Sequence, residues 1–373
     1  MIPRGKLDIS WSALGTGLRY CLQDLLSTSK PSPAPIDEQN TIHCLSVRTG
    51  LDLCLRALKL EPGSEILVSN INIPDMFSII AAHQLIAVPL PIDKQTLDLS
   101  LSDVSAAINT KTKAILITHL FGAIMDADSV IRFAKKHNLI VLEDCAQAFD
   151  GIYKGHPLSD VALFSFGLIK TNTSVTGARL HTNNPEFKGI LLTLNSALPT
   201  QETSLYFKKL LKAGLIKILT TKFCYTLLYR WSQINGKDFD AILSGFSKGF
   251  PGAEVMHKIQ YRPCMANLRL MQKRTYEFSM ADLERRKLNA KCVMRQIPVK
   301  MHIGALNPLH SHWVLPVESS NPESLIIRLR KNGIDATAKA SSLTKLPSIV
   351  KENDLTLGNL VYVPIQISKF PIE

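Results

Sequence analysis

No stretch of this 373-residue chain reaches the roughly 18 uncharged apolar residues of a membrane-spanning helix. Residues Met1–Ser10 lack an apolar core and a small-residue cleavage site, so no secretory signal is predicted. The seven cysteines are an odd number, and no two of them are spaced as CxxC. Several lie within apolar runs, as reduced core cysteines do. These features predict a cytoplasmic protein without a structural metal.

Acidic residues are in the minority, since 43 lysines and arginines face 31 aspartates and glutamates, for a formal net charge of +12. Such an excess is typical of proteins that bind nucleic acid or an anionic surface. No recognised nucleic-acid motif accompanies it, so we favour a basic enzyme with anionic ligands, or simply solvated lysines. A DNA-binding regulator stays as an alternative, which predicts retention on DNA at low salt and steep loss as salt rises.

From about residue 40 to 190, short apolar runs alternate with amphipathic stretches. This pattern predicts an α/β fold with a mostly parallel sheet covered on both faces, in which ligands bind at the carboxyl ends of the strands. The predicted strands are Glu65–Ser69, Ala87–Leu90, Ala114–Thr118, Leu139–Glu143 and Val161–Phe166. The predicted helices are Thr49–Leu60, Met76–His83 and Ala127–His137.

The rest of the chain divides into two parts. Residues 199–250 include Leu205–Trp231, which has five lysines, one arginine and no acid, and is predicted to be a helical insertion that Gly236 and Gly245 interrupt. We therefore predict a large domain over 1–250 and a small α/β domain over 251–373. The elements predicted in the small domain are strands at Ser311–Val317, Ile334–Thr337 and Leu360–Ile365 and a helix at Pro322–Asn332.

The strongest local signal is the segment Leu139–Phe149, in which a short apolar strand leads to Glu143 and Asp144. Carboxylates at the carboxyl end of a strand lie where α/β active sites form. The alternative is that Asp144 caps a following turn or helix.

A second buried strand ends at Ser165, with Lys170 five residues later. A lone loop lysine is usually solvated, but together the two segments meet the needs of pyridoxal 5′-phosphate (PLP). This cofactor requires a Schiff-base lysine and a carboxylate that keeps its ring nitrogen protonated. It also requires phosphate donors, which Ser46–Thr49 at a helix start could supply, unless this segment is an ordinary helix cap.

The order of these segments resembles the DegT/DnrJ/EryC1/StrS family, the sugar aminotransferases of fold type I. Ser46–Thr49 stands where the family has its Ser-Gly-Thr-type phosphate loop, and Ser165-Phe166 with Lys170 matches its SF…K segment. The other matching segments are Pro62–Ile66 (PGDEV in the family), His119–Gly122 (HLYG) and Glu143–Ala148 (EDAAQA).

The resemblance implies a role for each matched residue. Lys170 would form the Schiff base, Asp144 would pair with the pyridinium nitrogen, and Gln147 would lie beside the ring near O3′. The phosphate would be held by Ser165, and by Arg48 and Thr49 at the helix start.

The resemblance also implies a homodimer. Gln260 begins a segment, Gln-Tyr-Arg-Pro, that stands for the family's Asn-Tyr-Arg-Met, which reaches the cofactor of the partner subunit.

The chain departs from the family at two places near the expected site. Ile73 occupies the position of an aromatic residue that stacks on the cofactor ring, and an aliphatic side chain packs there with less stacking energy. The glycine-rich stretch after the lysine is reduced to Ser174–Ala178, which contains one glycine. These departures predict a substrate fit different from that of the sugar enzymes.

The histidines give weaker signals. We interpret His119 as structural, whereas His310 and His312 either face the substrate or are solvated. No His/Cys cluster has metal-ligand spacing, so no metal is expected.

These observations predict a PLP-dependent aminotransferase that moves an amino group, from glutamate by family resemblance, to a keto acceptor. The acceptor is a keto-sugar nucleotide by family default, or a lipid-linked or amphiphilic ketone. A sugar dehydratase is disfavoured because related dehydratases replace the lysine with histidine. A non-catalytic protein that kept the fold is the alternative from another class.

The composition of Leu205–Trp231 also suggests contact with a membrane surface. The alternative is a helix pair that packs on the sheet or in a dimer interface, because its lysines do not fall on one clean helical stripe.

Overall fold

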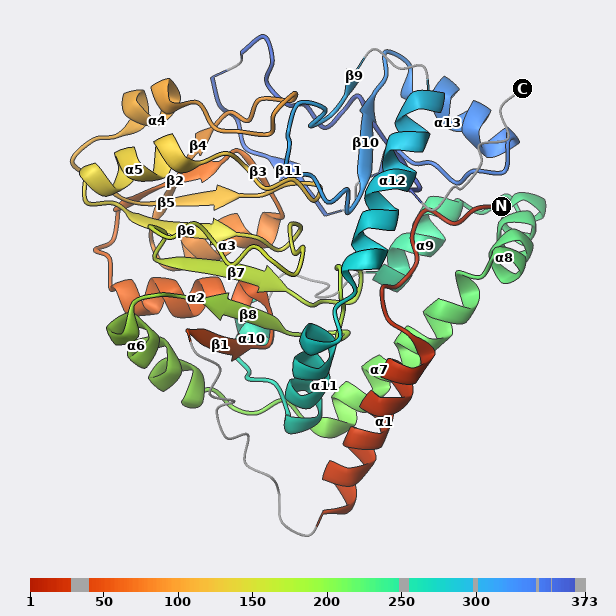
Figure 1. Ribbon diagram of the computed structural model, residues 1–373, viewed down its shortest axis with the longest axis horizontal. Helices are drawn as coiled ribbons and strands as arrows, with labels where there is room; N and C mark the ends of the chain where they lie inside the picture. Colours follow the sequence, from red (N-terminus) through yellow and green to blue (C-terminus); the bar gives the residue numbers. More distant parts are fainter. Residues whose placement is uncertain (28–39, 248–254, 298–300, 340–341, 350, 366–373) are drawn as a thin grey trace.

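The computed structural model describes residues 1–27, 40–247, 255–297, 301–339, 342–349 and 351–365 (Figure 1). Its centre is a seven-stranded sheet in the order β1-β8-β7-β6-β5-β2-β4. Strands β7 to β4 in this order pair in parallel, and β8 and β1 add an antiparallel edge. The strands are β1 (Thr41–Cys44), β2 (Glu65–Ser69), β4 (Ile86–Leu90), β5 (Thr112–Thr118), β6 (Ile140–Asp144), β7 (Val161–Ser165) and β8 (Ala178–His181).

Helices cover both faces of this sheet. Alternate residues of each strand point to opposite faces, so Ile66 and Val68 of β2 join one core cluster and Leu67 joins another. The first cluster includes α2 (Val47–Leu58), α3 (Pro74–Ala82) and α6 (Pro185–Ser196). The second includes α4 (Leu101–Ala107) and α5 (Asp128–Lys136). The predicted α/β class and mostly parallel sheet are confirmed.

A second, antiparallel sheet forms near the C-terminus, in the order β12-β10-β9. Its strands are β9 (Met301–His302), β10 (Leu315–Glu318) and β12 (Leu360–Val363), and α12 (Met280–Gln296) and α13 (Pro322–Lys331) accompany it. The strand predicted at Ile334–Thr337 is wrong. That segment makes only isolated bridges, from Ile334 to Ile2 and from Thr337 to Tyr362, because the N-terminal segment runs alongside it.

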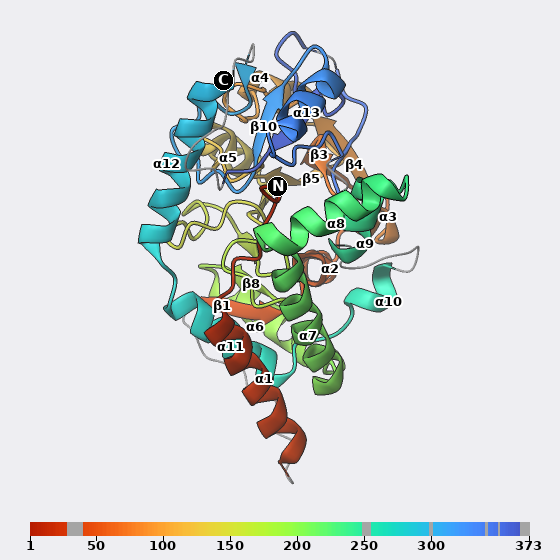
Figure 2. The same ribbon diagram turned by 90° about the vertical axis from the view of Figure 1, so that its right-hand side faces the viewer.

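The basic insertion consists of α7 (Thr203–Leu219), α8 (Lys222–Ile234) and α9 (Phe239–Ser247), so its helical character is confirmed. Gly236 follows α8 with a φ of 59°, as predicted for a break, but Gly245 lies inside α9. An N-terminal helix that the sequence did not predict, α1 (Trp11–Leu26), packs along α7 and α11 (Met265–Tyr276) (Figures 1 and 2). The helices described are all too short or too polar to cross a membrane.

Candidate active site

The predicted site residues lie at the edge of the sheet where the parallel strands end. Asp144 is the last residue of β6, and Ser165 is the last residue of β7. The short strand β3 (Ile71–Asn72) follows β2 at the same edge and pairs with β11 (Thr344–Lys345). The parallel topology therefore brings together segments that lie almost 100 residues apart in sequence.

Asp144 is buried and its two carboxylate oxygens are fixed separately. The Asn72 side-chain amide donates to Oδ2 at 2.9 Å, and the backbone N–H of Ala146 donates to Oδ1 at 3.0 Å. The same amide nitrogen of Asn72 also donates to Thr118 Oγ1 at 2.9 Å. Asn72 was not predicted from the sequence, although it directly precedes Ile73, which was assigned to the site.

Lys170 lies in the turn that follows β7 and is half-buried. Burial lowers its pKa from 10.5 to about 8, with the positive charge of Arg48 adding to the shift and Asp144 opposing it. The Nζ atom lies 4.0 Å from the centroid of the Trp313 ring, a cation–π contact. An amine with this pKa is partly neutral near pH 8, and a neutral amine is the nucleophilic form.

Trp313 was also missed, because the sequence analysis assigned it to a strand. The segment that carries it lies directly against Gly122, whose carbonyl accepts from the N–H of Ser311 at 2.7 Å. Gly122 has a φ of +100°, and a Cβ atom there would lie 2.4 Å from the backbone nitrogen of Trp313. The Gly122 position therefore requires glycine, and it lets the C-terminal part of the chain reach Lys170.

The N-terminus of α2, which is the predicted phosphate site, is capped by the side chain of Ser46. Ser46 Oγ accepts from the N–H of Thr49 at 3.1 Å, and the Thr49 hydroxyl donates to the carbonyl of Ile259 at 2.8 Å. The Arg48 guanidinium pairs with Asp75 at 2.5 Å. The Thr49 hydroxyl proton is thus engaged in the protein, which leaves the helix N-terminus and Arg48 as the stronger candidates for phosphate binding.

Gln147 and Ser165, which are also predicted to contact the cofactor, make hydrogen bonds within the protein. Gln147 Oε1 accepts from the N–H of Phe121 at 2.8 Å, so its amide N–H groups are the ones directed to other partners. Ser165 Oγ accepts from the N–H of Gly167 at 3.3 Å, and its hydroxyl proton remains able to donate. Ile73 lies just before α3, half-buried against the core, and Gln260 follows α10 (Val255–Ile259).

The loop after Lys170 carries backbone strain where the family has glycines. Val175 has a φ of 73°, in the left-handed region that β-branched residues avoid. Its N–H donates to Thr173 Oγ1 at 2.8 Å, and Ser174 Oγ donates to the carbonyl of Thr176 at 2.7 Å. Hydroxyl side chains thus hold a turn that glycine would adopt freely.

Glu143 forms a buried network behind the site. Its carboxylate accepts from His119 Nε2 at 2.9 Å, Tyr153 Oη at 2.5 Å and the N–H of His156 at 2.7 Å. Burial alone would raise the Glu143 pKa, but these hydrogen bonds, led by that from His119, lower it to about 2.

His119, Glu143 and Cys145 lie close enough to hold a metal ion. His119 Nδ1 accepts from the N–H of Met125, however, so both ring nitrogens are already used, as in a structural histidine.

His310 and His312 are both buried, with their rings stacked at 4.0 Å. Burial contradicts the solvated interpretation of these histidines, whereas the substrate-facing interpretation stays a prediction.

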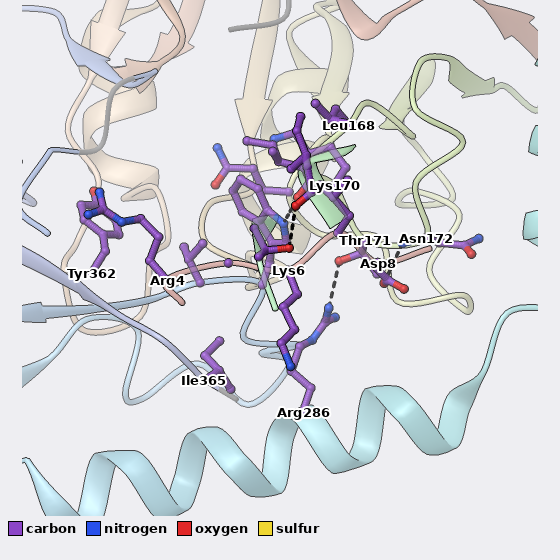
Figure 3. A pocket seen from close by; sticks show the side chains of 18 of the residues that line it. Arg4, Lys6, Asp8, Leu168, Lys170, Thr171, Asn172, Arg286, Tyr362 and Ile365 are labelled. Atoms are coloured by element: carbon purple, nitrogen blue, oxygen red, sulfur yellow. Dashed lines mark hydrogen bonds between the residues drawn. The ribbon is translucent and has the colours of Figure 1, made fainter. Parts of the chain in front are cut away.

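A cavity of about 620 Å³ opens beside Lys170 (Figure 3). Gln147 and Phe121 line it near Lys170, and the N-terminal segment 4–8, α12 and the insertion helices line the remainder. The lining does not include Arg48, Thr49, Ile73, Asp144, Ser165 or Gln260. Of the predicted cofactor residues, Lys170 and Gln147 thus border this cavity.

Solved structures of other proteins have a similar fold. Helicobacter pylori PseC, described as an aminotransferase involved in the biosynthesis of pseudoaminic acid, is similar with a TM-score of 0.65 and 15% identity, over 97% of this chain and 93% of that one. The structure of a GDP-4-keto-6-deoxymannose-3-dehydratase is similar with a TM-score of 0.61 and 16% identity, over 90% of this chain and 85% of that one. The chain therefore shares the overall fold of these two enzymes.

Sequence comparison is more specific. Residues 35–212, a little under half of the chain, match the model of the DegT/DnrJ/EryC1/StrS aminotransferase family, so this segment is similar to that family. The GDP-perosamine synthase of Escherichia coli O157:H7 is 36% identical over 156 residues, which cover 39% of this chain and 42% of the relative. The match thus spans about two-fifths of this relative's length. Gln260, Arg286 and Trp313 lie outside the family match.

Proposed function

We propose that the protein is a PLP-dependent aminotransferase. The observation that carries the proposal is the placement of Lys170, an amine of lowered pKa in the turn after β7, where the charge of Asp144, a buried carboxylate at the end of the adjacent strand β6, acts on it. The family match over residues 35–212 and the fold support the same activity.

The residues present fit PLP. Asp144 would accept a hydrogen bond from the ring nitrogen, because it is fixed at the strand end with one amide donor on Oδ2. The N-terminus of α2, with Arg48 and Ser165, would bind the phosphate, and Gln147 would lie near the ring. Bound there, PLP would supply a ring that withdraws electrons from the substrate Cα. Lys170 Nζ would bind the cofactor aldehyde and accept the proton that leaves the substrate Cα.

For the substrates, we propose glutamate as the amino donor and a keto-sugar nucleotide or an amphiphilic ketone as the acceptor. The relative named above is called a GDP-perosamine synthase, which favours a sugar. A dehydratase shares the fold, but the lysine at position 170 favours transamination over dehydration. A non-catalytic protein of this fold is the second candidate, and the strained Val175 loop and the aliphatic Ile73 favour it.

We also propose a homodimer, in which Gln260 reaches the cofactor site of the partner subunit. In this chain Gln260 is half-buried and the adjacent Tyr261 is 39% exposed, so the segment is accessible to a partner. Sedimentation equilibrium of the PLP-loaded protein should give twice the chain mass, and an active monomer would rule the arrangement out.

The test of the activity is spectroscopic. Protein mixed with PLP should become yellow, and glutamate should then shift the absorbance as the amino group is transferred. Lys170→Ala should lose the visible band while its circular dichroism stays that of wild type. A wild-type protein that never becomes coloured, or full transaminase activity in the variant, would refute the assignment.

Finally, we propose that the outer face of α7 and α8 contacts a membrane surface. The enzyme would then be cytoplasmic and act at the inner face of that membrane.

A further inference from the structure

Both basic and apolar side chains line the cavity beside Lys170. The basic group includes Arg286 of α12 and Lys6 of the N-terminal segment, and Figure 3 shows the Lys6 side chain extending toward Arg286. The apolar group comes from the insertion, through Leu219 of α7, Leu228 of α8 and Leu243 of α9. The volume of about 620 Å³ is ample for a ligand that contacts both groups.

Arg286 is held beside the reacting lysine with part of its guanidinium unused. Its Nε donates to the carbonyl of Ser311 at 2.8 Å, and its Nη1 donates to the hydroxyl of Thr171, the residue after Lys170, at 3.0 Å. The Nη2 atom is buried, and within the described residues it has no hydrogen-bond partner. A buried guanidinium donor without an acceptor is costly, so a ligand acceptor at Nη2 would be stabilising.

The acidic residues around the cavity do not neutralise Arg286. The charge of Asp8 acts on it, but Asp8 also accepts from the backbone N–H of Asn172 at 2.8 Å and pairs with Arg274 at 3.4 Å. The other acids that line the cavity each have a basic partner of their own: Asp240 pairs with Arg4, Glu277 with Lys273, and Asp282 with Arg285. The position at Nη2 is therefore suited to an anion.

The apolar group belongs to a part of the chain that the family model does not cover. Leu219, Leu228 and Leu243 all follow residue 212, where the match ends, and all three are half-buried beside the cavity. Contact with a hydrocarbon group would remove more of this surface from water, which is favourable in proportion to the apolar area covered. A polar sugar would gain much less at these residues.

We propose that the acceptor substrate is an anionic amphiphile. Its phosphate or carboxylate group binds Arg286 beside Lys170, and its hydrocarbon portion lies against the leucines of α7, α8 and α9. This inference rests on the proposed aminotransferase function, because it names the class of ketone that the same site accepts.

Calorimetric titration of the full, PLP-loaded protein tests the inference with three probes below their micelle-forming concentrations. Octyl phosphate carries both features, inorganic phosphate carries the anion, and octyl glucoside carries the chain. Octyl phosphate should bind at least tenfold more tightly than either of the others. Equal affinity for octyl phosphate and inorganic phosphate would overturn the apolar part, and equal affinity for octyl phosphate and octyl glucoside would overturn the anionic part.

Variants test the two groups separately. Arg286→Gln should weaken octyl phosphate roughly tenfold, as expected for one charged hydrogen bond, and leave octyl glucoside unchanged. Arg295→Gln, which removes the same charge from the same helix outside the cavity lining, should have no effect. Leu219→Asn should weaken octyl phosphate but not inorganic phosphate, whereas Leu215→Asn, on α7 but absent from the lining, should match wild type.

The controls separate the outcomes. Arg286→Lys keeps the charge and should restore part of the affinity if Arg286→Gln acts through binding and not through misfolding. If Arg286→Gln and Arg295→Gln behave alike, Arg286 is not the anion site.

The titration requires no turnover, so a protein that transaminates without preferring octyl phosphate overturns this inference alone. A protein that prefers octyl phosphate through Arg286 but never transaminates supports the binding site and overturns the proposed function alone.

Discussion

The Lys170 Nζ atom lies 4.0 Å from the centroid of the Trp313 ring, and the Trp313 indole N–H donates to the carbonyl of Ile169 at 3.0 Å. One side chain from the C-terminal part of the chain thus contacts both the Lys170 amine and the turn that carries it. Because the ring face attracts a cation, Trp313 favours the protonated form of Lys170, against the effect of burial.

The first prediction concerns the pH at which Lys170 reacts. Its pKa is lowered to about 8, so the neutral amine becomes the major form above pH 8 and not above pH 10.5. The rate at which the PLP-dependent visible absorbance develops should therefore rise between pH 7 and 9 and level off above. Stopped-flow mixing across this range measures it, and a rate still rising steeply at pH 10 would contradict the lowered pKa.

The second prediction concerns Trp313. Trp313→Leu keeps the site apolar but removes about 1 kcal/mol of cation–π attraction, which should lower the midpoint of that pH profile by roughly 0.7 pH unit. Trp313→Phe keeps an aromatic face without the N–H donor and should move the midpoint less. An unchanged midpoint in Trp313→Leu would show that the ring does not affect the amine.

The third prediction concerns Asp144→Asn. Both oxygens of Asp144 accept hydrogen bonds from N–H donors, so an amide group at this position must direct its own N–H atoms toward one of them. We expect a loss of about 1–3 kcal/mol in the free energy of unfolding, measured by urea denaturation. PLP should still bind, but turnover should fall at least tenfold, because an amide cannot hold the ring nitrogen protonated. Turnover within a few-fold of wild type would place the essential carboxylate elsewhere.

The sequence predicted the part of the site that depends on strand ends. Apolar runs followed by polar residues placed Asp144 and Ser165 at strand ends, where the structure has them, and Lys170 in the segment after the second strand, since a parallel sheet brings its carboxyl ends to one edge. Trp313 and Arg286 could not be found in this way, because long-range packing against Gly122 and Thr171 places them. The same limit explains the wrong strand at Ile334–Thr337, whose backbone partner is the distant N-terminal segment.

The last prediction concerns the outer face of the insertion. On α8, Phe223, Leu227, Trp231 and Ile234 are exposed by 74%, 51%, 46% and 84%, and their spacing of three or four residues puts them on one side of the helix. The exposed side of α7 likewise carries Leu211, Leu215 and Ile218. The lysines on these two helices divide by burial: Lys208, Lys212 and Lys222 are exposed, while Lys209 and Lys217 are partly buried and burial lowers their pKa.

An exposed apolar row next to exposed lysines and without an acid between residues 203 and 237 is typical of a helix that lies in a membrane interface. Each lysine near anionic headgroups contributes about 1 kcal/mol, so changing Lys208, Lys212 and Lys222 together to glutamate should abolish binding to anionic liposomes. Flotation of wild type and this variant, with neutral liposomes as the control, measures the effect. Packing of this face against a second subunit is the alternative. It predicts that both proteins float negligibly, and that the variant loses its dimer in sedimentation.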